Sequence, residues 1–114
     1  VLSHIKSDKN DDFNKILNDT VLVAMSEYQD VDPTKNKLNK KANNSFEILE
    51  PSNMNEDSTW TYVMIADPYI HGANYLLGDP LVQKYGKETA KEIYGRWSEC
   101  FNSGQDVYFS ERPK

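Results

Sequence analysis

The sequence predicts an α+β domain in which a four-stranded antiparallel sheet has its two main helices on one face. Two observations support this prediction. Residues 59–66 are mostly β-branched or aromatic, which is typical of a strand. Apolar residues recur at spacings of three and four over residues 11–28 and 87–101, which indicates two amphipathic helices. We therefore expect a single domain over residues 1–114.

The first half of the chain predicts a strand, a helix and a second strand. Residues 1–6 have β-branched side chains near both ends, and turn-forming residues follow them. The helix that comes next has Asp11 and Asp12 in its first turn, where the helix dipole favours negative charge. Residues 45–50 alternate and are followed by Pro51, which predicts a strand near the edge of the sheet.

The second half predicts two consecutive helices after the strand at 59–66. Pro80 follows an aspartate that can cap a helix, and proline is favoured at the first helical position. Gly86 is expected to end this short helix, and a longer one follows it. The apolar stripe of the longer helix contains Tyr94, Trp97 and Phe101, which we expect in the core.

A last short strand is predicted over residues 106–110. The elements then follow in the order strand, helix, strand, strand, helix, strand. With right-handed crossovers, this order folds most simply as a ferredoxin-like βαββαβ unit.

Residues 30–44 have no apolar period and contain Pro33 and four lysines. We expect them to form a flexible polar loop. The alternative is a basic docking patch for an anionic ligand. That alternative is less favoured, because no aromatic residue stands among the lysines to stack on a base.

The composition excludes several classes of function. The chain has 13 Lys and Arg against 18 Asp and Glu, and its net charge of −5 argues against nonspecific binding of nucleic acid. No run of about 18 apolar residues predicts a membrane span. The single cysteine, Cys100, excludes an intrachain disulfide and a zinc site built from cysteines. No phosphate-binding loop or paired-histidine metal motif occurs, so we expect neither a metal nor another cofactor.

The chain begins at Val1, inside a predicted strand. We therefore expect it to be an excerpt that lacks its natural N-terminus, and a removed signal peptide is compatible with this. No compartment is predicted.

The strand at 59–66 is bulky and largely apolar on both faces. Val63 and Ile65 point one way, and Trp60, Tyr62 and Met64 point the other. The two helices can cover only one face, so we expect the aromatic face to be covered by a second copy of the chain. The predicted architecture is a homodimer in which two sheets face each other.

The layout resembles the dimeric α+β barrel superfamily. The resemblance rests on the element order, on residues 2–6 leading to Phe13, and on the run over 59–69. This superfamily includes antibiotic-biosynthesis-monooxygenase-like domains, stress-responsive barrel domains and haem-degrading enzymes. It implies a barrel that encloses a small molecule, but no catalytic motif of a family matches these positions.

The only two histidines, His4 and His71, are the candidate catalytic residues. His4 lies on the first strand, where a neutral imidazole facing the barrel interior would act as a base or bind a haem iron. His71 lies in a loop after the strand at 59–66. The alternative for both is a side chain that only makes local hydrogen bonds.

Aromatic side chains are the candidate ligand-binding residues, because small-molecule sites are usually lined by apolar walls with few polar groups. The same side chains would also suit a dimer interface. The candidates are Trp60, Tyr62, Met64, Tyr69 and Tyr108.

Three functions stay open from the sequence. The first is a small-molecule-binding barrel, of the cofactor-free monooxygenase-like kind that the resemblance implies, for a small aromatic or apolar ligand. In that function His4 or His71 would be the base, and Tyr62 or Tyr108 would orient the substrate. The second is a non-catalytic dimerisation or interaction module, and the third is a haem-binding barrel.

Overall fold

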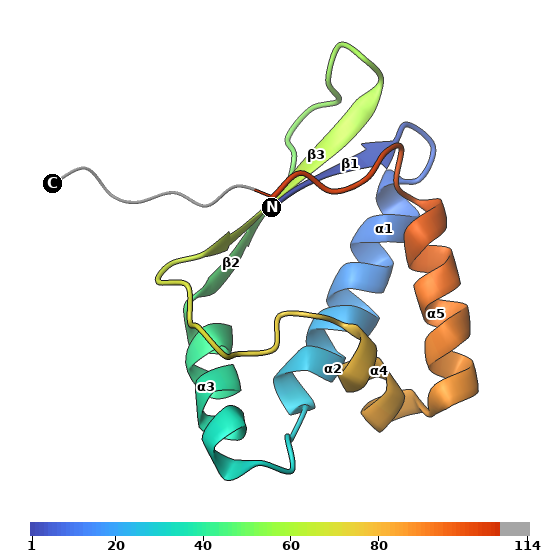
Figure 1. Cartoon of the computed structure of the whole chain (residues 1–114). Helices are drawn as coiled ribbons and strands as arrows, with labels where there is room; N and C mark the ends of the chain where they lie inside the picture. The colour runs from blue at the N-terminus through green and yellow to red at the C-terminus, as the bar shows by residue number, and fades with distance from the viewer. Residues whose placement is uncertain (108–114) are drawn as a thin grey trace, which may run out of the picture.

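The computed structural model describes residues 1–107, which fold as a three-stranded antiparallel sheet with four helices (Figure 1). β1 (Leu2–Lys6) comes first, and one long helix follows as α1 (Asn10–Ile16), the π-helical turn η1 (Leu17–Val21) and α2 (Leu22–Glu27). The remaining elements are α3 (Pro33–Asn44), β2 (Phe46–Leu49), β3 (Thr59–Ala66), α4 (Gly78–Tyr85) and α5 (Lys87–Glu99). The predicted α+β class and antiparallel sheet are confirmed. Among residues 1–107, no helix is both long and apolar enough to cross a membrane.

The strands lie in the order β1-β3-β2. The segment after α5 lies along the free edge of β1, where a ferredoxin-like sheet has its fourth strand. The backbone N–H of Leu2 donates to the carbonyl of Asp106 at 2.7 Å, and the N–H of Asp106 donates back at 3.0 Å. A second bridge joins Ile5 to Phe101. The predicted strand at 106–110 starts at this edge, but most of it lies outside the described residues, so the fourth strand stays a prediction.

Helix α3 occupies most of the segment that was expected to be a loop, so that expectation was wrong. Asp32 caps the helix by accepting a hydrogen bond from the N–H of Thr34 at 2.9 Å, and Pro33 starts it. The apolar period is missing because one of the buried positions on the inner face of α3 is a polar residue. Asn39 is buried, and its Oδ1 accepts a hydrogen bond from the N–H of Asn74 at 2.7 Å.

The main core lies between the sheet and the helices α1 and α5. Phe13 is fully buried at its centre. The centroid of its ring is 4.6 Å from that of Tyr62, 4.5 Å from that of Trp97 and 5.5 Å from that of Phe101. These aromatic contacts join β3, α1 and the C-terminal end of α5. A smaller cluster joins α2 to α4 and α5 through Ala24, Leu81, Ala90 and Ile93.

The predicted assignment of the faces of β3 was wrong. Tyr62 is only 1% exposed and belongs to the main core, and Trp60 and Met64 pack against that core. The aromatic side chains therefore point toward the helices, and the aliphatic Val63 and Ile65 point away from them. The pairing explains this choice, because Ser3 lies directly opposite Tyr62 and its small buried side chain leaves room for the ring.

Tyr94 was also placed wrongly, since 53% of this side chain is exposed. The buried positions of α5 are Ala90, Ile93 and Trp97, and Cys100 follows the helix. They form a narrow stripe at spacings of three and four, and Tyr94 lies beside it. Trp97 is in the core as expected, and Phe101 packs against the core while partly buried.

Replacing Tyr62 with Phe should lower the free energy of unfolding by about 1 kcal/mol while the fold is kept. The ring stays in place, but the hydroxyl loses its hydrogen bonds to Asn10 Oδ1 at 2.7 Å and Asn14 Nδ2 at 3.3 Å. Urea denaturation measures the change. Tyr94→Phe is the matched control and should be neutral, because that side chain is exposed.

Tyr62→Phe should also differ from wild type in how the free energy of unfolding depends on pH. Burial raises the pKa of Tyr62 above its ordinary value. The neutral hydroxyl therefore stabilises the fold fully below the unfolded pKa of about 10, and this contribution is lost as the pH rises through the folded pKa. Wild type should lose stability more steeply than Tyr62→Phe in that range. Parallel curves for the two proteins would contradict the burial argument.

Candidate functional site

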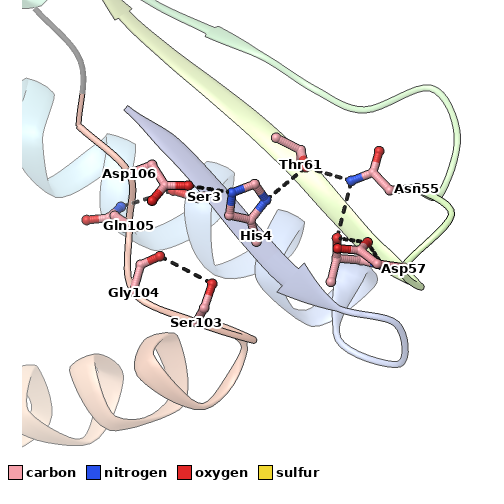
Figure 2. A network of polar contacts seen from close by, with 10 residues as sticks. Ser3, His4, Asn55, Asp57, Thr61, Ser103, Gly104, Gln105 and Asp106 are labelled. Atoms are coloured by element: carbon pink, nitrogen blue, oxygen red, sulfur yellow. Dashed lines mark hydrogen bonds and ion pairs between the residues drawn. The ribbon is translucent and has the colours of Figure 1, made fainter.

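His4 lies on the face of the sheet that points away from the helices, between a carboxylate and a hydroxyl (Figure 2). Its Nε2 is 2.9 Å from Oδ2 of Asp106, and its Nδ1 is 3.1 Å from Oγ1 of Thr61. The side chain is 26% exposed, so solvent reaches it. These contacts form a carboxylate–imidazole–hydroxyl chain across the sheet.

The strand pairing brings these three groups together. His4 lies directly opposite Thr61 in the register of β1 and β3. On the other edge of β1, one bridge pairs Ile5 with Phe101 and another pairs Leu2 with Asp106. Between these two bridges, the C-terminal segment has more residues than β1 has. The segment bulges between these two bridges, and Asp106 meets the imidazole of His4 after the bulge.

The loop before β3 continues the polar network. Asn55 Nδ2 donates to Oγ1 of Thr61 at 2.7 Å and to Oγ1 of Thr59 at 3.2 Å (Figure 2). The Thr59 hydroxyl donates to Oδ1 of Asp57 at 2.6 Å. This hydrogen bond is the main reason that the pKa of Asp57 lies below its ordinary value, and the nearby imidazole of His4 also lowers it.

This arrangement determines the proton positions in neutral His4. A carboxylate only accepts hydrogen bonds, so Nε2 donates its proton to Asp106 and Nδ1 is the basic nitrogen. Because Asn55 donates to Thr61, the Thr61 hydroxyl directs its own proton to Nδ1. When Nδ1 takes up a proton, the carboxylate of Asp106 stabilises the positive charge. The hydrogen-bonded set of Asp106, His4 and Thr61 can therefore accept a proton at Nδ1 of His4.

The structure does not bring the other candidate residues to His4. His71 follows the far end of β3, and its exposed ring packs edge-to-face on Tyr69 with centroids 5.2 Å apart. Tyr69 also stacks on Tyr75 at 5.0 Å. The two candidate histidines therefore lie apart, with His4 on β1 opposite Thr61 and His71 in the loop after β3.

The expectation that Trp60, Tyr62 and Met64 line a pocket on the open face was wrong, because their side chains pack under the helices. The indole Nε1 of Trp60 donates to the carbonyl of Ser7 at 3.1 Å. Tyr108, the remaining candidate, lies outside the described residues.

Sequence reasoning missed three members of the site, namely Thr61, Asn55 and Asp106. Thr61 stands two residues before Val63 and so shares its face, which was a usable signal once the phase of the strand was known. Asp106 is 102 positions from His4, and no local pattern joins them. In the described part of the chain, no group of three or more His, Cys, Asp or Glu side chains is placed to hold a metal ion.

The proton positions can be tested with Asp106→Asn. In wild type, neutral His4 should have its proton on Nε2, and long-range ¹H–¹⁵N correlation of the imidazole measures this directly. The variant should weaken that preference, because an amide can donate as well as accept. Asp79→Asn is the control, because Asp79 lies in the first turn of α4 and outside this network, and it should leave the tautomer unchanged. A wild-type proton on Nδ1 would overturn the assignment.

Comparisons of the chain with models of protein families, with curated proteins and with solved structures gave no significant match. The resemblance to dimeric α+β barrels therefore stays an expectation from the layout. Function has to be inferred from the geometry around His4.

Proposed function

We propose that the protein binds a small molecule against the open face of its sheet, with His4 as the proton-accepting group and a second copy of the chain covering the rest of that face. One observation supports this most strongly. The imidazole is held between the carboxylate of Asp106 and the hydroxyl of Thr61 on a face where it is still reached by solvent. An oriented imidazole with a carboxylate behind it is the arrangement that general base catalysis uses.

The second copy is proposed because the part of the open face beyond His4, toward the C-terminal end of β3, is apolar. Leu2, Val63 and Ile65 point outward from β1 and β3, and Leu49 of β2, which lies opposite Val63, is 52% exposed. A sheet face that stays in water normally alternates to polar residues on that side. A contiguous apolar patch indicates an interaction site, and two-fold pairing covers it with the fewest components.

The observed orientation of the side chains of β3 changes the class of ligand that we expect. The aromatic side chains of β3 lie under the helices, so the walls near His4 are aliphatic and polar. No aromatic side chain of β3 is therefore available there to stack on a ring of the ligand. The ligand class that fits is a small weak acid with an apolar body, whose acidic proton passes to Nδ1 of His4 through or in place of the Thr61 hydroxyl. Monooxygenase-like chemistry is the finer form of this proposal and follows from the resemblance alone.

A non-catalytic interaction module is the second candidate. The observation that favours it is that both nitrogens of His4 already have partners within the protein, as expected for a polar cross-link between strands. The same observation disfavours haem binding by His4, because an iron ligand needs a free nitrogen.

The dimer can be tested with one charge placed on the open face. Wild type should scatter light as a particle of about twice 13.1 kDa at micromolar protein. Val63→Asp should give a monomer, because the buried carboxylate would lie in the interface. Val82→Asp is the matched control on the exposed surface of α4 and should leave the dimer intact. A monomeric wild type would contradict the proposal.

Proton transfer can be tested by titrating ¹⁵N-histidine-labelled protein with phenol and acetylacetone, two weak acids with small apolar bodies. The imidazole signals of His4 should shift with saturation and those of His71 should not. His4→Gln should abolish binding of both probes, and Asp106→Asn should weaken it by about tenfold, the effect of losing a charged hydrogen bond. Unshifted His4 signals would favour the interaction module.

A further inference from the structure

A groove of about 310 Å³ lies on the other side of the sheet edge, away from His4. Helices η1 and α2 form one wall, the end of α3 forms the second, and β2 forms the third. It exists because β2 is an edge strand and α1 and α5 pack over the centre of the sheet, so the inward side chains of β2 are only partly covered. Its volume is near the lower end of the range for small-molecule sites.

The floor of the groove is apolar and comes from two elements. Leu22 and Met25 project from α2, and Phe46 and Ile48 project from β2, all of them partly buried. The flexible thioether of Met25 can adapt to the shape of a bound body. Such a floor favours an apolar ligand body of modest size.

The rim is polar, and most of its donors are already used. Asn18 Nδ2 donates to the carbonyl of Asn14 at 3.0 Å and to Oε1 of Glu50 at 3.4 Å. Asn43 Nδ2 donates to the carbonyl of Met25 at 3.3 Å, and the hydroxyl of Ser26 donates to a backbone carbonyl at 2.8 Å. The rim therefore offers mainly acceptors, namely the second carboxylate oxygen of Glu50 and the amide oxygens of the two asparagines.

The charge around the groove also favours a ligand group that is positively charged and donates hydrogen bonds. Glu50 is the one charged side chain among its lining residues. The lysines of α3 do not line it, although Asn43 of that helix does. Asn18 lies in the π-helical turn η1, and such turns recur at functional sites.

We propose that this groove is a binding site for a small primary ammonium compound with an apolar body, of the arylalkylamine class. The body would lie on Leu22, Met25 and Phe46. The ammonium group, with three donors and no acceptor, would meet the carboxylate of Glu50 and the amide oxygens of the rim. The site is separate from His4 and is independent of the function proposed for that residue.

The test uses 2-phenylethylamine as the probe and follows the Met25 methyl group and the side-chain amides of Asn18 and Asn43 by NMR. Their signals should shift with saturation. The neutral analogue 2-phenylethanol should bind about fivefold to tenfold more weakly, and 3-phenylpropionate should not bind, because the rim repels an anion. Equal binding of the amine and the alcohol, or no shift at Met25, would overturn the proposal.

Two variants, Glu50→Gln and Ser26→Lys, test whether the rim residues are responsible for binding the amine. Glu50→Gln should weaken binding of 2-phenylethylamine by about fivefold to tenfold and remove the preference over the alcohol. Glu47→Gln is the matched control, because Glu47 is on the same strand and points to the opposite face. Ser26→Lys is an independent variant that places a cation at the rim, and it should abolish binding. Equal weakening by Glu47→Gln would overturn the assignment.

Discussion

The packing of Phe13 against Tyr62 is the constraint on which the rest of the structure depends. Side chains of a strand alternate between faces, so burying one of them determines the direction of all the others. With the Tyr62 ring 4.6 Å from that of Phe13, Trp60 and Met64 also face the helices. Thr61, Val63 and Ile65 must then face outward. The register of β1 places His4 on the same outer face, so the candidate site is a direct consequence of this one aromatic contact.

The second requirement for the site is the return of the chain to the edge of β1. The backbone pair between Leu2 and Asp106 closes a loop of almost the whole described chain. It places a carboxylate next to an imidazole and so selects the basic nitrogen of His4. The bulge before Asp106 interrupts the ladder and adjusts the position of that residue. Irregular pairing beside a polar site is a common way for a sheet to direct one side chain.

The edge strand β2 supplies side chains to two surfaces of different character. Leu49 is on the open face with His4, where an apolar area adjoins the polar network of His4. Phe46 and Ile48 point to the opposite side and form part of the floor of the groove, whose rim is acidic and rich in acceptors. Because a strand of a few residues separates them, one surface can be altered while the other is kept. A chain with an overall charge of −5 is also expected to favour cationic ligands over anionic ones.

The sequence by itself determined the class of fold and most elements, because the patterns at β1, β2, β3, α4 and α5 are local. It missed α3, where buried Asn39 takes the place of an apolar residue. It could name His4 but not Asp106 or Asn55, since these partners meet only through strand pairing and a loop that folds back. Only the tertiary structure decided which face of β3 is inside. The physical reason is that alternation specifies which residues share a face, whereas the choice of the inner face depends on the space that Ser3 leaves opposite Tyr62 and on the helix side chains that fill it.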